Sequence, residues 1–362
     1  MEIKYQLKPA AERRQEQFRP EGNVGFGRLR TDHMFLMDYY DGEWRDPRIV
    51  PYGPFSVAPG AVALHYGQSI FEGAKAFMHQ DGEIYTFRIN KNAERMNRSA
   101  DILCIPYLPE EMQLQAINAL IDADRLWFPM QDGACLYIRP FIFATEDRLS
   151  VSPSTSYTFC VVLSPSGAYY GASLSPISLL ISTHYHRAAP GGTGASKASG
   201  NYAASLRAGR AAKEVGASQV LYLDNNNVYI EEAGAMNHFH ILKDGTVVIP
   251  AFTDTILRSI TSQSIIELAA ELGYPVRQEM VRLDDFIKGI ETGDIIEAGG
   301  FGTAAVVSPV GSYIFEDGRR LNVGDGKVGE HVKHIYEVYT AIQRGERKAP
   351  AGWLQPVPHL GH

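Results

Sequence analysis

Alternation between hydrophobic and polar positions predicts short strands and helices along most of the chain. An apolar run at 35–40 ends at Asp41-Gly42, a pair that favours a hairpin turn because both residues tolerate positive φ. The β-rich segment 84–88 leads into a helix that Asn90 is expected to cap. A further helix opening at Pro109 and strands at 136–139 and 159–163 complete the first half.

The second half has the same mixture of elements. We expect a strand at 177–183, a helix from Tyr202 to Val215, and hairpins at 219–231 and around Asp244-Gly245. Farther along, apolar residues between Leu257 and Leu272 recur on one helical face. Asp254 is the expected cap of that helix.

A Pro-, Gly- and Ser-rich stretch separates the two halves. At 362 residues the chain exceeds the size at which a single hydrophobic core keeps growing. We therefore expect two domains of α/β (α+β mixed) class: a small domain at 1–164, an interdomain loop at 165–174 and a larger domain at 175–362. The tail beyond Asn322 carries no motif.

Composition restricts the class of ligand and the compartment. The net charge is −7 and Lys and Arg do not cluster, which argues against nucleic acid as a partner. Cys104, Cys135 and Cys160 show no CxxC spacing, so we expect core thiols in a reducing compartment rather than disulfides or a zinc site. No stretch approaches the roughly 20 apolar residues of a membrane span, and the start lacks a signal-peptide pattern. We expect a cytoplasmic protein that binds a small molecule.

One lysine lies in a stretch of small residues. Lys197 follows Gly-Gly-Thr-Gly-Ala-Ser and precedes Ala-Ser-Gly-Asn-Tyr, so little side-chain bulk would obstruct a flat ligand. Lysine amines attack carbonyl groups when their charge is suppressed, and aldehyde cofactors are common partners. The alternative is a solvated loop lysine, which is the commoner outcome for such a composition.

Three other segments can serve the same ligand. Glu231 and Glu232 precede small residues at a strand end; a carboxylate there is either solvated or, if buried, the partner of a pyridine nitrogen. The segment 253–258 opens a helix whose N–H groups suit a phosphate, as the start of every helix does. The glycine-rich segment 299–305 has the composition of an anion-binding turn, which ordinary tight turns share.

Motifs of other chemistries are weaker. The segment 192–197 lacks the Gly-Lys-Ser/Thr core of a P-loop, and no strand leads directly into it. The pairs His184/His186 and His238/His240 each place two imidazoles on one strand face, but no third ligand follows at a metal-site spacing. Structural histidines are the simpler interpretation. No Ser/His/Asp order with a nucleophile elbow is visible.

In order and spacing, the singled-out segments resemble the branched-chain aminotransferases, which are fold-type IV pyridoxal-phosphate enzymes. The segments that carry the likeness are 197–202, 232–237 and 302–305, with upstream matches at 31–34, 64–77, 87–88 and 136–140. The likeness covers about residues 24 to 310, which is most of both expected domains.

The resemblance implies a small N-terminal α/β domain and a larger C-terminal pseudo-barrel domain that binds pyridoxal 5′-phosphate. It implies amino-group transfer between L-leucine, L-isoleucine or L-valine and 2-oxoglutarate, giving branched 2-oxo acids and glutamate. The expected assembly is a homodimer or a larger oligomer. The expected partners are amino acids and 2-oxo acids, without nucleic acid, membrane or metal.

The resemblance also implies cofactor contacts. Lys197 is similar to the lysine that binds the cofactor covalently and then moves the α-proton, and Glu232 to the partner of the ring nitrogen. Tyr202 would contact the ring oxygen. The phosphate would be held by Arg88, the N–H groups of Ile256 and Leu257, and Thr303.

Substrate contacts are implied in the same way. An aliphatic side chain would lie among five aromatic residues: Phe26, Tyr66, Phe71, Tyr137 and Tyr202. Arg139 would receive the second carboxylate of glutamate, shielded by tyrosines until that carboxylate arrives. The backbone at Thr303 and Ala304 would bind the α-carboxylate. Tyr66 would act from the neighbouring subunit, and Tyr169 would lie in the interdomain loop over the site.

The chain departs from some family members. Ala235 replaces a threonine of animal relatives, which affects one contact near the carboxylate, and Ala305 with Ser308 replaces their redox-sensitive cysteine pair. Alternatives within the fold are a D-amino-acid or (R)-amine aminotransferase and an aminodeoxychorismate lyase; segments 137–140 and 302–304 favour the branched-chain interpretation. Alternatives outside it are a non-catalytic cofactor-binding protein and a metal-dependent binder that uses the His pairs.

Overall fold

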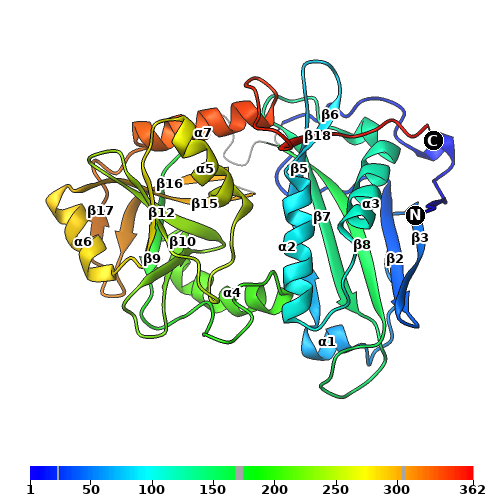
Figure 1. Cartoon of the computed structure of the whole chain (residues 1–362), viewed down its shortest axis with the longest axis horizontal. Coiled ribbons are helices and arrows are strands. Elements are labelled where there is room, and N and C mark those ends of the chain that lie inside the picture. Colours follow the sequence, from blue (N-terminus) through cyan, green and yellow to red (C-terminus); the bar gives the residue numbers. More distant parts are fainter. Residues whose placement is uncertain (23, 168–173, 304–305, 362) are drawn as a thin grey trace. The chain divides into compact units, whose positions relative to one another are not determined.

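The computed structural model describes residues 1–22, 24–167, 174–303 and 306–361. The chain forms two compact units (Figure 1). The first comprises Met1–Gly171, Ser196–Gly200 and Ile342–His362, and the second comprises Ala172–Ala195 and Asn201–Ala341.

This division differs from the expected domain boundaries in three places. Ser196–Gly200 lies within the expected larger domain but belongs with the first unit. Residues 342–362 belong with the first unit because strand β18 (Leu354–Pro356) pairs antiparallel with β6 (Ile84–Phe87). The expected interdomain loop at 165–174 begins inside strand β8 (Tyr157–Ser166), and its residues 168–173 lie outside the described part.

The first unit is built on a nine-stranded sheet. The strand order is β1-β3-β2-β8-β7-β5-β6-β18, and β4 pairs with β7. The remaining strands are β1 (Lys4–Tyr5), β2 (His33–Tyr40), β3 (Glu43–Pro51), β4 (Ser69–Phe71), β5 (Ala74–Met78) and β7 (Cys135–Ala144). The hairpin β2–β3 turns at Asp41 and Gly42, which have φ of 51° and 81°, as the Asp-Gly pair predicts.

Helices cover this sheet and complete its core. They are α1 (Val62–Tyr66), α2 (Ile89–Ile102) and α3 (Glu110–Ala123), with short 3-10 turns at Ala10–Glu12 and Arg125–Trp127. Met96 of α2 and Leu120 of α3 pack with Ile138 of β7 in one buried cluster. Since side chains alternate along a strand, Tyr137 and Arg139 face the side of β7 opposite this core. The core thereby fixes two of the expected site residues.

The second unit contains a sheet that closes into a barrel. Its strand order is β11-β10-β9-β16-β15-β12-β13-β14, β17 pairs with β16, and β11 pairs with β12 as well. The last pairing closes a ring of β11, β10, β9, β16, β15 and β12, which confirms the expected barrel. The strands are β9 (Ile177–Ile181), β10 (Gln219–Leu223), β11 (Ile230–Ala233), β12 (Met236–Leu242), β13 (Val247–Pro250), β14 (Val276–Glu279), β15 (Ile295–Gly302), β16 (Val306–Ile314) and β17 (Arg320–Asn322).

Four helices accompany the barrel strands in the sequence: α4 (Ser199–Glu214), α5 (Ile260–Glu271), α6 (Leu283–Thr292) and α7 (Glu330–Gln343). The expected hairpins β10–β11 and β12–β13 are confirmed as antiparallel pairs. The expected cap of α5 is wrong. Asp254 instead accepts a hydrogen bond from the Gly191 N–H at 2.7 Å, and α5 begins six residues later.

The cysteines are all free, and two of the three are core residues. Cys135 and Cys160 are buried, whereas Cys104 is exposed. The expectation of a core thiol is therefore wrong for Cys104, because α2 ends at Ile102 and Cys104 lies in the turn that follows, with φ of 53°. In the described ranges, no helix is long and apolar enough to cross a membrane.

Candidate functional site

The first unit holds Lys197 by its backbone. The Lys197 N–H donates to the Ser99 hydroxyl at 2.9 Å, and the Lys197 carbonyl accepts from the Phe71 N–H at 3.1 Å. Ala198 forms a bridge with Ile70. The Lys197 ammonium nitrogen lies 4.4 Å from the centroid of the Phe71 ring. Lys197 is thus fixed against β4 and α2, which contradicts a solvated loop lysine.

A buried carboxylate lies beside this segment. Glu72 is 1% exposed and accepts hydrogen bonds from Arg95 at 2.7 and 2.9 Å and from the Asn92 amide at 2.7 Å. Burial alone would raise the pKa of Glu72, but Arg95 and Lys197 outweigh burial, so the pKa is lowered. Glu72 was not among the predicted site residues. Its sequence signal is the spacing of Asn92 and Arg95, which share a face of α2.

An arginine enclosed by aromatic rings lies on the open face of β7. The Arg139 guanidinium carbon is 4.7 Å from the Phe71 ring centroid and 5.3 Å from that of Tyr137. Arg139 donates to the Tyr137 hydroxyl at 3.0 Å, while its Nε is buried without a hydrogen-bond partner in the described structure. Phe26 packs edge-on against Tyr137 at 4.7 Å. Phe26, Phe71, Tyr137 and Arg139 therefore form one cluster, which we call the aromatic–arginine cluster.

A glycine leaves room for this cluster. A Cβ on Gly73 would lie 2.1 Å from the Tyr137 hydroxyl, a distance that the aromatic–arginine cluster could not accommodate without moving. Gly73 follows Glu72 directly, and the Gly73 N–H donates to the Glu72 carboxylate at 3.1 Å. The Glu-Gly pair consequently connects the Lys197 segment to the aromatic–arginine cluster.

Arg88 has an unusual backbone and a partner from the tail. It is 4% exposed, and its φ of 47° places it in the left-handed region at the N-terminus of α2, where Asn90 was the expected cap. The Arg88 guanidinium carbon lies 4.4 Å from the Trp353 ring centroid. The Arg88 backbone N–H donates to the Trp353 carbonyl at 2.7 Å. A non-glycine residue in this region is strained, which is common at functional sites. The tail, which lacks any motif, thus fixes a predicted phosphate ligand.

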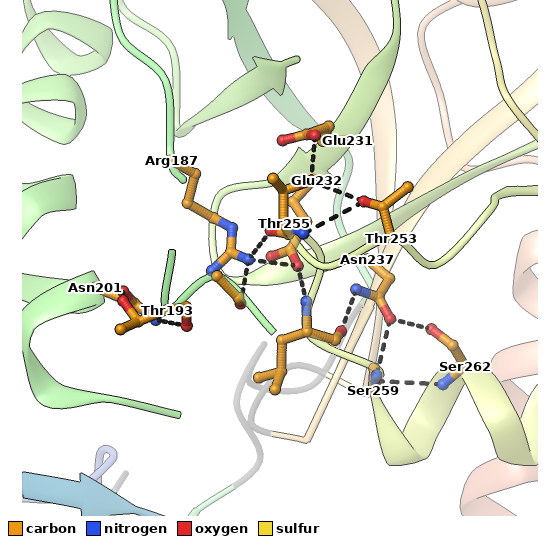
Figure 2. A network of polar contacts seen from close by, with 12 residues as sticks. Arg187, Thr193, Asn201, Glu231, Glu232, Asn237, Thr253, Thr255, Ser259 and Ser262 are labelled. Atoms are coloured by element: carbon orange, nitrogen blue, oxygen red, sulfur yellow. Dashed lines mark hydrogen bonds and ion pairs between the residues drawn. The ribbon is translucent and has the colours of Figure 1, made fainter. Parts of the chain in front are cut away.

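The second unit contains a buried acid–base pair (Figure 2). Glu232 is 3% exposed, and its carboxylate lies 3.2 Å from the Arg187 guanidinium and accepts from the Leu257 N–H at 2.7 Å. Arg187 also donates to the carbonyl of Gly194 at 2.8 Å and to that of Thr255. Burial contradicts the solvated strand end, and the guanidinium stabilises the ionised carboxylate. Arg187 was not predicted, because its partners are remote in the sequence.

The expected phosphate donors at Ile256 and Leu257 are engaged elsewhere. The Leu257 N–H binds Glu232, and the Ile256 N–H faces the Thr253 carbonyl at 3.4 Å. Both N–H groups therefore have partners within the chain, and the helix starts later than its expected cap implies.

Ser259 caps α5 and leaves two donors open. The Ser262 N–H donates to the Ser259 hydroxyl at 3.3 Å, the arrangement of an N-cap. Within the described ranges, neither the Ile260 nor the Thr261 N–H donates a hydrogen bond. Unpaired N–H groups at the positive end of a helix bind anions such as phosphate. In the sequence, Ser259 was the signal that could have placed the start of α5, and with it the two open N–H groups, at this point.

Asn237 orients the approach to α5. Its amide donates to the Leu257 carbonyl at 2.9 Å, and its carbonyl oxygen accepts from the Ser259 N–H at 3.0 Å and from the Ser262 hydroxyl at 2.9 Å (Figure 2). Asn237 closes the 232–237 motif, so the motif includes both Glu232 and the residue that positions the loop beside it.

The places of three other predicted residues in the fold are defined. Tyr202 lies in the first turn of α4, Thr303 follows β15 directly, and Tyr66 is the last residue of α1 with 42% exposure. Tyr169 and Ala304 lie outside the described residues.

The histidine pairs have no site-like environment. Burial lowers the pKa of His238 well below its usual value and that of His240 to about 3. His238 contacts the Tyr313 hydroxyl at 2.8 Å. The rings of His238 and His240 both pack against Phe286. His186 contacts the Asn227 side chain at 3.0 Å. No cluster of three possible metal ligands occurs in the described portion of the chain.

Comparison with known proteins identifies the family. Residues 69–312 match the family described as amino-transferase class IV. Branched-chain-amino-acid transaminase 1 of Bacillus subtilis (strain 168) is 45% identical over 338 residues, which are 92% of this chain and 94% of that protein. The branched-chain-amino-acid aminotransferase of Mycobacterium tuberculosis (strain CDC 1551 / Oshkosh) is 41% identical over 96% of this chain and 95% of its own length.

Solved structures give the same result for the fold. The branched-chain amino acid aminotransferase from Escherichia coli superposes with a TM-score of 0.72 at 30% identity, covering 90% of this chain and 99% of that chain. The branched-chain amino acid aminotransferase from Thermobaculum terrenum, solved in its PLP form, superposes with a TM-score of 0.74 at 24% identity. The match covers 90% of this chain and 98% of that chain. The chain therefore belongs to the class IV aminotransferase family. Its fold is fold type IV, and the enzymes of this family depend on pyridoxal phosphate.

The residues present fit that cofactor. Its aldehyde requires an amine, its ring nitrogen an acidic partner, and its phosphate cations and N–H donors. Lys197 would supply the amine and Arg88 a buried cation. Glu232 would supply a buried carboxylate that faces Arg187, and Ile260 and Thr261 would supply two open N–H groups.

Proposed function

We propose that the chain is a branched-chain-amino-acid aminotransferase that works between L-leucine, L-isoleucine or L-valine and 2-oxoglutarate. The observation that carries the proposal is the aromatic–arginine cluster, in which rings at 4.7 and 5.3 Å enclose the Arg139 guanidinium. The rings offer an apolar wall to an aliphatic side chain, and the guanidinium offers charge to a carboxylate. One site can then accept both kinds of substrate. Relatives that carry this name at 41–45% identity support the assignment.

Several residues would share the contacts to the cofactor. When bound, pyridoxal phosphate takes up the amino group of the substrate and withdraws electrons from the substrate carbon. Lys197 Nζ would bind the cofactor covalently and would move the α-proton. Glu232 would keep a proton on the ring nitrogen, because an ionised carboxylate accepts the hydrogen bond that the protonated nitrogen donates. Arg88 and the N–H groups of Ile260 and Thr261 would hold the phosphate.

The remaining contacts follow the family resemblance. Tyr202 would contact the ring oxygen, and Thr303 would add to the phosphate contacts. Thr303 and Ala304 would bind the α-carboxylate through their backbone. Aromatic contacts to substrate would come from Phe26, Tyr66, Phe71, Tyr137 and Tyr169.

The proposal includes a homodimer in the cytoplasm. Leu64 and Tyr66 of the short helix α1 are 66% and 42% exposed, and Leu149 and Val151 of the nearby loop are 70% and 84% exposed. The Val62 N–H donates to the Glu146 carbonyl at 3.0 Å, which joins α1 to the start of that loop. Exposed apolar residues gathered in this way are typical of subunit interfaces. The three free cysteines support a reducing compartment.

The substrate class can be tested by half-reactions. Purified protein loaded with pyridoxal phosphate is mixed with L-leucine, D-alanine or an (R)-amine, and loss of the visible absorption of the lysine-bound cofactor is followed. L-Leucine is expected to react fastest because the aromatic–arginine cluster favours an aliphatic side chain. A faster reaction with D-alanine or the amine would overturn the specificity. Absence of any visible band in loaded protein would overturn the enzymatic function.

Removal of the Arg139 charge is expected to slow the reaction with 2-oxoglutarate but not the reaction with L-leucine. Arg139→Met keeps much of the apolar surface but removes the charge, so kcat/KM for 2-oxoglutarate should fall about 10- to 100-fold, as expected for a lost hydrogen-bonded carboxylate contact. The half-reaction with L-leucine should change about twofold or less. Steady-state and half-reaction kinetics measure both. An equal loss with both substrates would show that Arg139 supports the fold of the site rather than the second carboxylate.

A further inference from the structure

Two adjacent carboxylates on β11 hold the same loop. Glu231 and Glu232 are 6% and 3% exposed. Neighbouring residues of a strand point to opposite faces, yet both side chains reach the segment 253–257. Glu232 accepts from the Leu257 N–H, and Glu231 accepts from the Thr255 hydroxyl, as Figure 2 shows. Only Glu232 has an assigned task in the proposed reaction.

The two carboxylates have different partners. Glu232 faces the Arg187 guanidinium at 3.2 Å. The second oxygen of Glu231, Oε2, is buried and has no hydrogen-bond partner among the described residues. An ionised oxygen without a partner is costly to bury, whereas a protonated carboxyl group carries no charge. The environment of Glu231 thus favours the neutral acid.

The electrostatic surroundings of Glu231 agree with this assignment. Burial raises the pKa of Glu231, and Asp224 adds to the increase. The Thr255 hydroxyl, Arg187 and His186 act in the opposite direction without cancelling it. Two neighbouring carboxyl groups whose environments separate their protonation states usually have separate tasks.

Thr255 connects Glu231 to the Arg187–Glu232 pair. The Thr255 hydroxyl binds Glu231, and the Thr255 carbonyl accepts from Arg187. Thr255 is 3% exposed and packs tightly on Gly194, where a Cβ would lie 2.7 Å from the Thr255 Cα. The Gly194 carbonyl is the other carbonyl that holds Arg187. The position of Thr255 therefore determines where the guanidinium meets Glu232.

We infer that Glu231 is a positioning residue that fixes Thr255 by its hydroxyl, so that Thr255 holds Arg187 against Glu232. Glu231 acts as a neutral group and does not touch the cofactor. The inference rests on the proposed function, because the benefit of an ordered Glu232 is its contact with the ring nitrogen.

The test compares Glu231→Gln, Glu231→Ala and Thr255→Val, with Glu271→Gln at the exposed end of α5 as a control for removal of a carboxylate. Cofactor-free protein is titrated with pyridoxal 5′-phosphate. Glutamine has the shape of the neutral acid and keeps an oxygen for Thr255, so affinity should stay within about twofold of wild type. Alanine and Thr255→Val each remove the hydrogen bond and should weaken affinity by about five- to tenfold.

A second measurement does not depend on the cofactor. Since the pKa of Glu231 is raised in the folded state, the stability that Glu231 contributes to wild type is fully present below the unfolded pKa of about 4.3 and is lost as pH rises through the folded value. Glu231→Gln lacks this loss. Its urea midpoint, relative to that of wild type, should therefore increase from pH 4.5 to pH 7. Glu271→Gln is measured in parallel as the control for removal of an exposed carboxylate.

The outcomes separate this inference from the proposed function. If wild type does not bind pyridoxal phosphate, the proposed function fails. If wild type binds and Glu231→Gln loses as much affinity as Glu231→Ala, the neutral role is wrong. If Glu231→Ala and Thr255→Val both bind as tightly as wild type, Glu231 does not position the pair. Should Glu231→Ala not fold, Glu231→Gln and Thr255→Val still decide the matter.

Discussion

Replacing Lys197 by alanine is expected to abolish transamination, with kcat falling by about 10⁴-fold or more. The substitution removes both the amine that would bind the cofactor and the base that would move the α-proton. Alanine keeps the backbone N–H and carbonyl of Lys197, which bind Ser99 and Phe71, so the local fold should persist. Transamination between L-leucine and 2-oxoglutarate measures the loss.

The matched control is Lys213→Ala. Lys213 lies in the last turn of α4 and is exposed, so its removal should leave kcat within about twofold of wild type. After borohydride treatment of loaded protein, the mass of a bound cofactor should appear on the peptide that contains Lys197 and be missing in the variant. Attachment to another lysine in wild-type protein would refute the assignment of Lys197.

The second large effect is expected at Glu232. Glu232→Gln replaces the ionised carboxylate by an amide, which cannot hold a proton on a ring nitrogen, and kcat should fall by about 10³-fold. The change also leaves Arg187 buried without its counter-charge. Breaking a buried ion pair in this way costs about 3 kcal/mol, so the urea midpoint should fall as well.

An exposed ion pair provides the comparison for Glu232. Arg277 and Glu279 lie 3.8 Å apart with side chains 52% and 47% exposed, and such pairs contribute little. Glu279→Gln should therefore change neither kcat nor the urea midpoint measurably. If Glu232→Gln retains more than a tenth of wild-type kcat, Glu232 does not serve the ring nitrogen.

Local sequence patterns predict much of the fold because they act over short distances. The hairpin β2–β3 depends on an Asp-Gly turn between alternating strands, and the structure has both. The start of α5 was mispredicted because two residues compete for the cap. Asp254 forms a hydrogen bond with Gly191, which is 63 residues away, and Ser259 caps the helix instead. Only tertiary structure determines that choice.

In the candidate site too, some residues can be found from local sequence patterns and others only from tertiary contacts. Lys197 and Glu232 stand in local motifs of small residues, so the sequence alone suggests them as candidates. Arg187, Glu72 and Trp353 act through partners that are remote in the chain: Arg187 binds Thr255, Glu72 binds Arg95, and Trp353 covers Arg88. Residue types alone do not predict such pairs, because a buried ion pair and an exposed one use the same side chains.

The discontinuity of the first unit affects how the protein can be made. Strand β18 and Trp353 belong to this unit, yet the ribosome synthesises them after the whole barrel. During translation, the edge of β6 therefore emerges without its final neighbour, and Arg88 emerges without the ring that stacks on it. Unpaired strand edges are prone to misassociation. A gene fragment for residues 1–171 would lack both Lys197 and β18, so this unit cannot be produced as one continuous stretch of the gene.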